Sequence, residues 1–406
     1  MVDLRFPSQQ ITVALSRHAA WAGGRGDGER LQRKGEDFTW LRLDSAKLND
    51  AVLSRCQFTG ASLVKAELRR ADLFAADFMR ADLSGAILDR ADLRGGNMMR
   101  AILRGASLNQ ADLRPGQIVL DSGASRSQAA NLSEAKLDGA DLRSAQLDEA
   151  NLSVSSATGA NFANASLFSV NLAGADLSGA NLTMARLKDV NLIGARLEGA
   201  LLQGADLRGA NLRNVDLSKV NLKGVDLSNS VYRKAANLPA EVDVILQAHS
   251  RWIATGGADG QRAILSGMKL PGCDFSSCDL RGAELHGCDL KGADFSSAQL
   301  LFASFIGADL PHSNFDQADL GGVNFTNSNL AGATFRGAKL VGAPLYSAGN
   351  GKTGRTVYPL MIATDLTGAD LRGAVLDHID LTQAKLARVN MAGADLRDCL
   401  GLSGAA

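Results

Sequence analysis

The feature that most constrains this chain is a sequence repeat with a period of five residues. Residues 71–86 read ADLFAADFMRADLSGA, and each unit places a small residue, then a polar residue, then leucine or phenylalanine. A period of five fits neither the roughly 3.6-residue turn of an α-helix nor the alternation of a β-strand. The sequence therefore predicts a solenoid whose coils each hold a whole number of units. In-frame central residues run from Phe38 to Ile118, Leu132 to Tyr232, Leu265 to Leu345 and Leu366 to Leu396, 62 units in all.

The bulky exceptions to leucine indicate the size of one coil. They recur every 20 residues, and large side chains pack best on large ones. They stand at Phe38, Phe58, Phe78, Met98 and Ile118, at Phe275, Phe295, Phe315 and Phe335, and at Phe305 and Phe325. Four units therefore make one coil, and we predict an all-β solenoid with four flat sides.

Individual units carry a resemblance to a known family. Ala71–Asp72–Leu73, Ala175–Asp176–Leu177 and Ala369–Asp370–Leu371 resemble pentapeptide repeat proteins, whose consensus is A(D/N)Lxx. The resemblance covers about three quarters of the chain and implies a right-handed quadrilateral β-helix. It also implies that the central leucine and the small residue two positions before it point inward. Because Asp and Asn share the slot between them, we expect that side chain to hydrogen-bond the local backbone.

A second, longer duplication divides the chain into two halves. Residues 11–21, ITVALSRHAAW, align with residues 242–252, VDVILQAHSRW, and a glycine-rich stretch follows each. Proline before and glycine after these segments indicate short helices. We therefore predict a helical cap at the start of each solenoid, within domains 1–233 and 234–406. The side chains expected to pack on the open coil ends are His18, Trp21, His249 and Trp252. The sequence leaves open whether the halves form one rod or two.

Two segments interrupt the repeat, at residues 119–131 and 346–365. The leucines that flank the second are 21 residues apart, one more than a coil, which favours one irregular coil with a bulge. Its GNGKTG motif has Tyr346 where a phosphate-binding loop needs its first glycine, so we interpret it as a flexible turn. Loops on a regular scaffold tend to carry specificity, which makes Lys352 and Arg355 candidate partner-binding residues.

One outward-facing pattern is a Met/Arg stripe, defined as Met79, Arg80, Met99 and Arg100. Its two dipeptides are 20 residues apart and should stack on one side of the coils. Residues 38–118 carry 12 basic and 9 acidic side chains, whereas residues 265–345 carry 5 and 8. One interpretation is an acidic partner docking on the stripe. The other is a solvated surface with local Arg–Asp pairs.

The cysteines raise the question of a metal site. Cys273, Cys278 and Cys288 lie close to His286 in the sequence. All three occupy the small inward slot, where cysteine replaces alanine as a small hydrophobe. Spacings of five and ten residues also place them on different sides of the coil. No Ser–His–Asp set or carboxylate pair stands out either, so we predict no metal, no cofactor and no enzyme activity.

Charge and composition narrow the function. The chain has 43 basic and 43 acidic side chains, which argues against a generally basic nucleic-acid binder. Five cysteines fit a reducing compartment, and no apolar run approaches a membrane span, so we expect a cytoplasmic protein. We predict a non-enzymatic scaffold that mediates protein–protein interaction with a partner that the sequence does not name.

Two alternatives follow from the family resemblance. Some pentapeptide repeat proteins imitate duplex DNA and protect type II topoisomerases such as gyrase, and others are secreted bacterial effectors. Zero net charge weakens the first alternative, and no feature of the sequence selects the second. The C-terminal segment DCLGLSGAA contains no obvious cap. Because an open coil end exposes backbone and leucine, we also expect a possible homodimer through the C-terminal coils.

Overall fold

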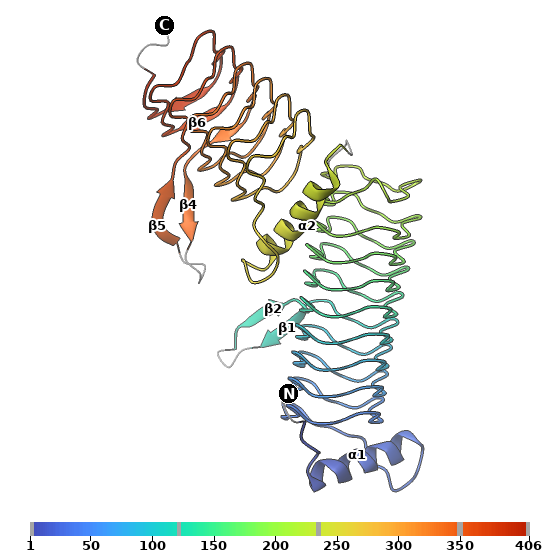
Figure 1. Ribbon diagram of the computed structural model, residues 1–406. Coiled ribbons are helices and arrows are strands. Elements are labelled where there is room, and N and C mark those ends of the chain that lie inside the picture. The colour runs from blue at the N-terminus through green and yellow to red at the C-terminus, as the bar shows by residue number, and fades with distance from the viewer. Residues whose placement is uncertain (1–3, 120–122, 233–236, 347–351, 403–406) are drawn as a thin grey trace. The chain divides into compact units, whose positions relative to one another are not determined.

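The computed structural model describes residues 4–119, 123–232, 237–346 and 352–402. The chain divides into two compact units. Unit 1 comprises Met1–Leu212 and Asp216–Ser230, and unit 2 comprises Arg213–Val215 and Val231–Ala406. Each unit contains a stack of coils, one α-helix and one β-hairpin (Figure 1).

The coils are held together by parallel backbone bridges that pair residues 20 positions apart, through hydrogen bonds such as Leu73 amide to Asp92 carbonyl and Asp92 amide to Ala71 carbonyl. Parallel bridges such as Asp72 to Asp92 in unit 1 and Asp294 to Asn314 in unit 2 repeat along both stacks. Each pentapeptide repeat ends in a turn that forms one corner of the coil. In the repeat around Leu83, the Ala86 amide donates to the Leu83 carbonyl at 2.9 Å, and Gly85 between them has φ +64°. This is the pattern of a type II turn, which needs a left-handed residue at its third position. Because one coil contains four repeats and each repeat has one such turn, the coil is four-sided.

The interior is the column of central residues that the repeat predicts. Leu83 is 1% exposed and Ala81 is fully buried, whereas Ser84 is partly exposed. In unit 1 the rings of Phe38, Phe58 and Phe78 stack with centroids 4.7–5.0 Å apart. In unit 2 two aromatic columns meet, because Phe275, Phe295, Phe315 and Phe335 stack on one another and contact Phe305 and Phe325 edge-on. The predicted inward and outward positions are therefore confirmed.

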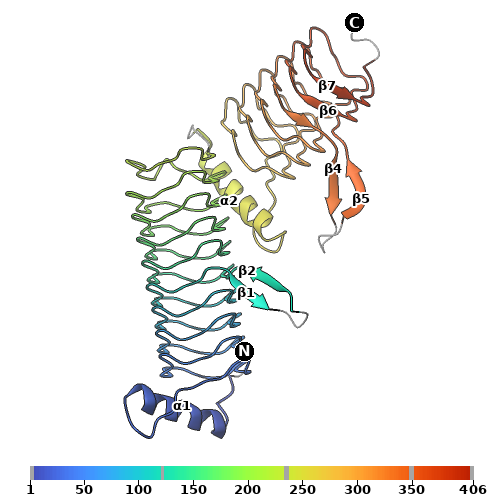
Figure 2. The same cartoon turned by 180° about the vertical axis from the view of Figure 1, so that it is seen from behind.

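Few residues form regular elements outside these single bridges. Helix α1 spans Gln9–Ala22 and begins at Ser8, whose Oγ accepts a hydrogen bond from the Ile11 amide. Helix α2 spans Ala240–Ala254 and begins after Pro239. Strands β3 (Lys339–Leu340), β6 (Val375–Asp377) and β7 (Asp395–Arg397) form a parallel sheet along one side of unit 2 (Figure 2).

Both interruptions of the repeat are antiparallel hairpins. Strands β1 (Gly116–Val119) and β2 (Ser125–Gln128) pair in unit 1, and β4 (Ala343–Tyr346) and β5 (Lys352–Val357) pair in unit 2. The coil continues beneath each hairpin. Bridged residues are normally 20 positions apart, but Asn97 pairs with Asn131, 34 positions away, and Asn324 pairs with Leu360, 36 positions away. The insertions are therefore 14 and 16 residues long.

The hairpins correct three expectations from the sequence. Ile118 lies in β1 and Leu345 in β4, so neither occupies the core column that its frame predicts. The second interruption is a hairpin and not an irregular coil with a bulge. The core position that follows it belongs to Met361, which is fully buried and which the in-frame count omitted.

Candidate binding surfaces

The polar slot before each central residue organises the outer surface. The carboxylate of Asp82 accepts the backbone amide of Ser84 at 2.9 Å, and Asn181 does the same for Thr183 at 3.0 Å. The predicted local hydrogen bond is therefore confirmed. It explains why Asp and Asn share the slot, since both offer an oxygen that bridges to the residue two positions later.

In six of the seven Asp–Leu–Arg triplets of these coils, the arginine clamps the aspartate of its own repeat, and in the seventh Arg397 forms a single ion pair with Asp395 at 3.2 Å. Arg94 donates from Nε to Asp92 Oδ1 at 2.9 Å and from Nη2 to Oδ2 at 2.7 Å. Such bidentate pairs are geometrically specific and offset the aspartate charge locally. The same clamp joins Asp112 to Arg114, Asp141 to Arg143, Asp206 to Arg208, Asp279 to Arg281 and Asp370 to Arg372.

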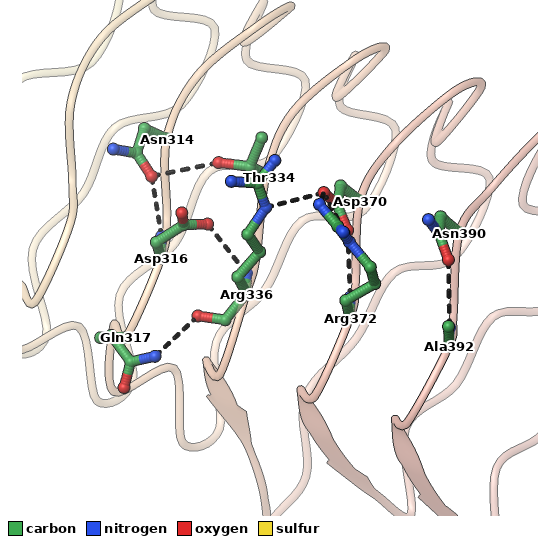
Figure 3. Close-up of polar contacts among 9 residues, drawn as sticks. All are labelled: Asn314, Asp316, Gln317, Thr334, Arg336, Asp370, Arg372, Asn390 and Ala392. Atoms are coloured by element: carbon green, nitrogen blue, oxygen red, sulfur yellow. Dashed lines mark hydrogen bonds and ion pairs between the residues drawn. The ribbon is translucent and has the colours of Figure 1, made fainter.

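Unit 2 extends this pairing from coil to coil. Arg336 donates from Nε to Asp370 at 2.7 Å, and Asp370 also accepts Nη2 of Arg372 at 2.8 Å (Figure 3). Asp316 accepts the Arg336 amide at 2.8 Å one coil earlier. Hydrogen bonds from Arg372, and then from Arg336, hold the pKa of the Asp370 carboxyl well below its ordinary value. The acidic residues of this surface are therefore held by neighbours rather than presented as a free carboxylate array.

The structure stacks the Met/Arg stripe but leaves it partly neutralised. The Arg80 amide donates to the Met99 carbonyl at 3.0 Å, which places the two dipeptides on adjacent coils. Met79 and Met99 are half-buried, and both arginines are exposed. Arg100 forms an ion pair with Glu134 at 2.7 Å, whereas Arg80 has no ion pair with any residue that the structure describes. Of the two arginines, Arg80 is thus the better candidate for a partner carboxylate.

The first hairpin is anchored on the coil beneath it. Gln128 donates from Nε2 to the Gly95 carbonyl at 2.6 Å, and the Arg94 guanidinium lies 5.7 Å from the centre of the Phe74 ring. Gly116 packs so closely that an added Cβ would lie 2.9 Å from that ring. Beyond this root the described strand residues are largely exposed, including Val119 at 58%. The hairpin is therefore a fixed projection with an exposed surface.

The second hairpin contains the candidates Lys352 and Arg355. Both belong to β5, so the expected flexible turn is wrong for residues 352–355, while residues 349–351 of the motif lie outside the described residues. Arg355 is exposed, and its amide donates to Thr353 Oγ1 at 3.3 Å. No strand–loop–helix arrangement surrounds these residues, so a phosphate-binding loop is not formed in the described part of unit 2.

The four predicted end-packing residues occupy matching sites in the two units. His18 Nδ1 accepts the Leu31 amide at 3.0 Å, and His249 Nδ1 accepts the Ala263 amide at 3.0 Å. Trp21 stacks on His18 at 5.4 Å, and Trp252 stacks on His249 at 5.6 Å. Burial lowers the pKa of His18 and lowers that of His249 to about 4. Both histidines are fully buried and neutral, with a packing role and no ligand contact among the described residues.

Within the described residues, the cysteines and His286 do not come together as a set of potential metal ligands. Cys278 and Cys288 are buried in the core, and Cys288 Sγ contacts the Leu265 carbonyl. His286 bonds instead to Ser304 Oγ at 2.8 Å. In the described residues, the potential ligands that do meet are Asp377, His378 and Asp398, which are largely exposed. His378 bridges the two carboxylates and stacks on Tyr358, so its ring is already engaged on three sides.

Comparison with known families identifies the repeat. The family model described as pentapeptide repeats matches in eight copies at residues 37–73, 76–114, 128–153, 145–183, 191–229 and 364–400. A second model, the pentapeptide repeat region, matches residues 268–345. Together they cover more than half of the chain. The chain belongs to the pentapeptide repeat family. Its solved members form right-handed quadrilateral β-helices, in agreement with the four-sided coils. No curated protein sequence matches this pentapeptide repeat protein.

Several solved pentapeptide repeat proteins are similar in structure. HetL, involved in heterocyst differentiation regulation in the cyanobacterium Nostoc, is 23% identical, with 75% of this chain and 86% of HetL covered and a TM-score of 0.22. QnrB1, a plasmid-mediated fluoroquinolone resistance protein, is 21% identical, with 50% and 89% covered and a TM-score of 0.30. A thylakoid lumen protein of Arabidopsis thaliana is 33% identical over 24% of this chain and 75% of its own, with a TM-score of 0.19.

The helices add one observation about location. Within the described residues, neither α1 nor α2 has the length and apolar character needed to cross a bilayer.

Proposed function

We propose that this pentapeptide repeat protein is a non-enzymatic scaffold that binds a protein partner on unit 1, through the β1–β2 hairpin and the side of the coils beside it. The observation that carries the proposal is the closed coil beneath the hairpin. Asn97 pairs with Asn131 as if the 14 residues were absent, so the hairpin is not needed to complete the solenoid. An anchored, exposed insertion that the fold does not need is well suited to recognition.

The Met/Arg stripe lies on the same side of unit 1 as the residues with which the chain re-enters the coil after the hairpin. Asn131 follows the hairpin and pairs with Asn97, which leads directly into Met98, Met99 and Arg100. A partner on this side would meet the hairpin at one edge and the exposed Arg80 at the other. Half-buried methionines offer adaptable apolar contact, and an unpaired arginine favours an acidic partner.

A deletion that removes the hairpin and preserves the repeat tests this proposal. Removing residues 115–128 joins Arg114 to Ala129 and restores the pentapeptide frame, while removing residues 343–358 does the same in unit 2 and serves as the control. We expect affinity capture from the native lysate, quantified by mass spectrometry, to show a specific protein reduced at least about tenfold by the first deletion and retained by the second. Equal retention by both variants would contradict the role of the β1–β2 hairpin.

The stripe has a test of its own. Met79→Asp, Arg80→Glu, Met99→Asp and Arg100→Glu together should reduce recovery of the same protein, since they reverse the charge that an acidic partner would meet. Undiminished recovery would restrict the interface to the hairpin.

A topoisomerase-protecting DNA mimic is the alternative that this scaffold proposal competes with. The aspartates of the coils are clamped by arginine at 2.7–2.9 Å, which reduces the negative potential that mimicry of a phosphate backbone requires. Supercoiling by gyrase measured with added full-length protein separates the two proposals. The scaffold proposal expects no effect, and inhibition that competes with DNA would favour the mimic.

Self-association through the C-terminal coils stays a proposal. Leu396 and Leu400, on the last described coil of unit 2, are 40% and 60% exposed. Light scattering should show a larger species that Leu400→Lys reduces to the mass of one chain. A monomer at every concentration would contradict it. No disulfide joins any of the five cysteines within the described residues, which supports the further proposal of a cytoplasmic location.

A further inference from the structure

Unit 2 contains a largely apolar pocket that lies outside the surfaces described above. It has a volume of about 550 Å³ and is bounded by the end of α2, one corner of the coils and the first residues of β4. Its walls include Trp252 and Ile253 from α2, Leu301 and Phe302 from the coils, and Pro344 from the hairpin. A cavity of this size suits a small organic ligand, since such sites range over roughly 300–1,000 Å³.

The pocket is built around an aromatic side chain in an unfavourable backbone position. Phe302 has φ +59°, in the turn slot that glycine fills most easily. Its ring lies over Gly322, where an added Cβ would be 2.9 Å from Phe302 Cδ1. One coil on the other side, Gly282 leaves its slot empty, and an added Cβ there would contact Trp252 at 3.9 Å. The two glycines therefore expose the Phe302 ring and keep the space beside Trp252 open.

One charged side chain lines this apolar space. Arg281 donates from Nε and Nη2 to Asp279 at 2.9 and 2.8 Å, and the Asp279 side chain is only 2% exposed. The buried carboxylate fixes the guanidinium at the edge of the pocket. Its Nη1 has no hydrogen bond to the residues that the structure describes, and the side chain remains 43% exposed. A preoriented arginine with donors to spare is a suitable site for a ligand carboxylate.

We propose that this pocket binds a small aromatic carboxylate, with its rings against Trp252 and Phe302 and its carboxylate on Arg281. Two aromatic walls favour a flat ring over a branched aliphatic group, because rings gain from stacked or edge-to-face contact. The guanidinium selects the acid over the neutral amide of the same shape. This ligand site is separate from the scaffold surface of unit 1 and does not depend on it.

Calorimetric titration of the full-length protein with 2-naphthoate tests the proposal. We expect one site per chain and at least about tenfold weaker binding of the neutral 2-naphthamide. Phe302→Gly removes the central ring and places the preferred residue in the left-handed slot, so the coil should fold and affinity should fall at least about tenfold. Arg70→Gly makes the same kind of change at a left-handed position of unit 1, φ +55°, and should leave binding unchanged.

Leu301→Glu supplies a second variant that does not depend on Phe302. It puts a carboxylate on the pocket wall at a partly exposed position and should repel the anion, again by about tenfold or more. Thermal melting would verify that each variant is folded. No binding at about 1 mM 2-naphthoate would overturn the proposal, and so would undiminished binding by both pocket variants. Equal affinity for the acid and the amide would overturn the role of Arg281.

Discussion

Unit 1 and unit 2 begin with the same helix and histidine but place their hairpins on different sides of the coil. We count pentapeptide repeats from the one whose backbone amide donates to the histidine, which contains Leu31 in unit 1 and Ala263 in unit 2. From there, 17 repeats precede the hairpin in unit 1 and 16 precede it in unit 2. One repeat is a quarter of a coil, so the additional repeat moves the insertion to the next side. In unit 2 the hairpin consequently shares a corner with Trp252, and the pocket forms between them.

The corresponding corner of unit 1 is polar. The Arg30 guanidinium lies 5.8 Å from the centre of the Trp21 ring and donates to the Asp50 carbonyl, and Arg70 pairs with Asp50 at 2.6 Å. Next in the same column, Arg90 bonds to Gln110. The outward positions can thus carry either a charged ladder or an apolar pocket while the leucine core stays the same. In this fold, the outward residues and the number of repeats before the hairpin therefore determine which surface the coil presents.

The largest expected difference between the units lies in their aromatic cores. Phe315→Ala removes two stacked and two edge-on ring contacts, whereas Phe58→Ala removes two stacked ones. Either change should lower the free energy of unfolding by about 3–5 kcal/mol, and each additional aromatic pair should add roughly 0.5–1.5 kcal/mol. Chemical denaturation of the full chain, with hydrogen exchange to assign each transition to its unit, measures both. Equal losses would mean that the second aromatic column contributes nothing beyond leucine.

The two histidine sites should make both units sensitive to acid. The unfolded state binds a proton near pH 6.5, but burial lowers the pKa of His249 to about 4 in the folded state. Stability from the neutral ring is therefore complete above about pH 6.5 and is lost as the pH falls towards 4. The full effect is roughly 3 kcal/mol, and the pKa of His18 is lowered in the same direction.

Denaturation midpoints between about pH 7.5 and 4.5 would measure this loss. His249→Gln should flatten the pH dependence of unit 2, while His312→Gln, at an exposed turn, should leave it unchanged. A pH dependence that survives His249→Gln would contradict the assignment.

The sequence predicted the regular parts of both units because their causes are local. The 20-residue spacing of Phe275, Phe295 and Phe315 identified the coil, and Asp–Asn exchange identified the hydrogen bond of the polar slot. The hairpins were missed because Ile118 and Leu345 continue the five-residue frame in sequence. The candidate site residues were placed by that frame, so the stripe stacked as predicted while the partner of Arg100, Glu134, was hidden by the insertion.

Two prolines in the sequence indicate where the regular repeat is interrupted by the hairpins. Pro115 occupies the turn slot that requires a positive φ, which the proline ring forbids. Pro344 occupies the polar slot whose amide donates to the previous coil, as Asp294 does to Cys273 at 3.0 Å, and proline has no amide hydrogen to donate. The pocket could not be predicted in this way, because it depends on which corner the hairpin reaches.

The smallest expected difference concerns the charged ladders. Asp50 pairs with Arg70 alone among the described side chains, whereas Asp370 accepts from both Arg336 and Arg372. Partly exposed ion pairs contribute little, so Asp50→Asn should lower the free energy of unfolding by no more than about 0.5 kcal/mol and Asp370→Asn by about 1 kcal/mol. Because the pKa of Asp370 is held below its ordinary value, its contribution is present above about pH 4 and is lost in stronger acid. Urea denaturation of both variants at low and high salt measures these losses. Both losses of unfolding free energy should become smaller at high salt. A larger loss for Asp50→Asn than for Asp370→Asn would show that the charged ladder of unit 2 is not the stronger one.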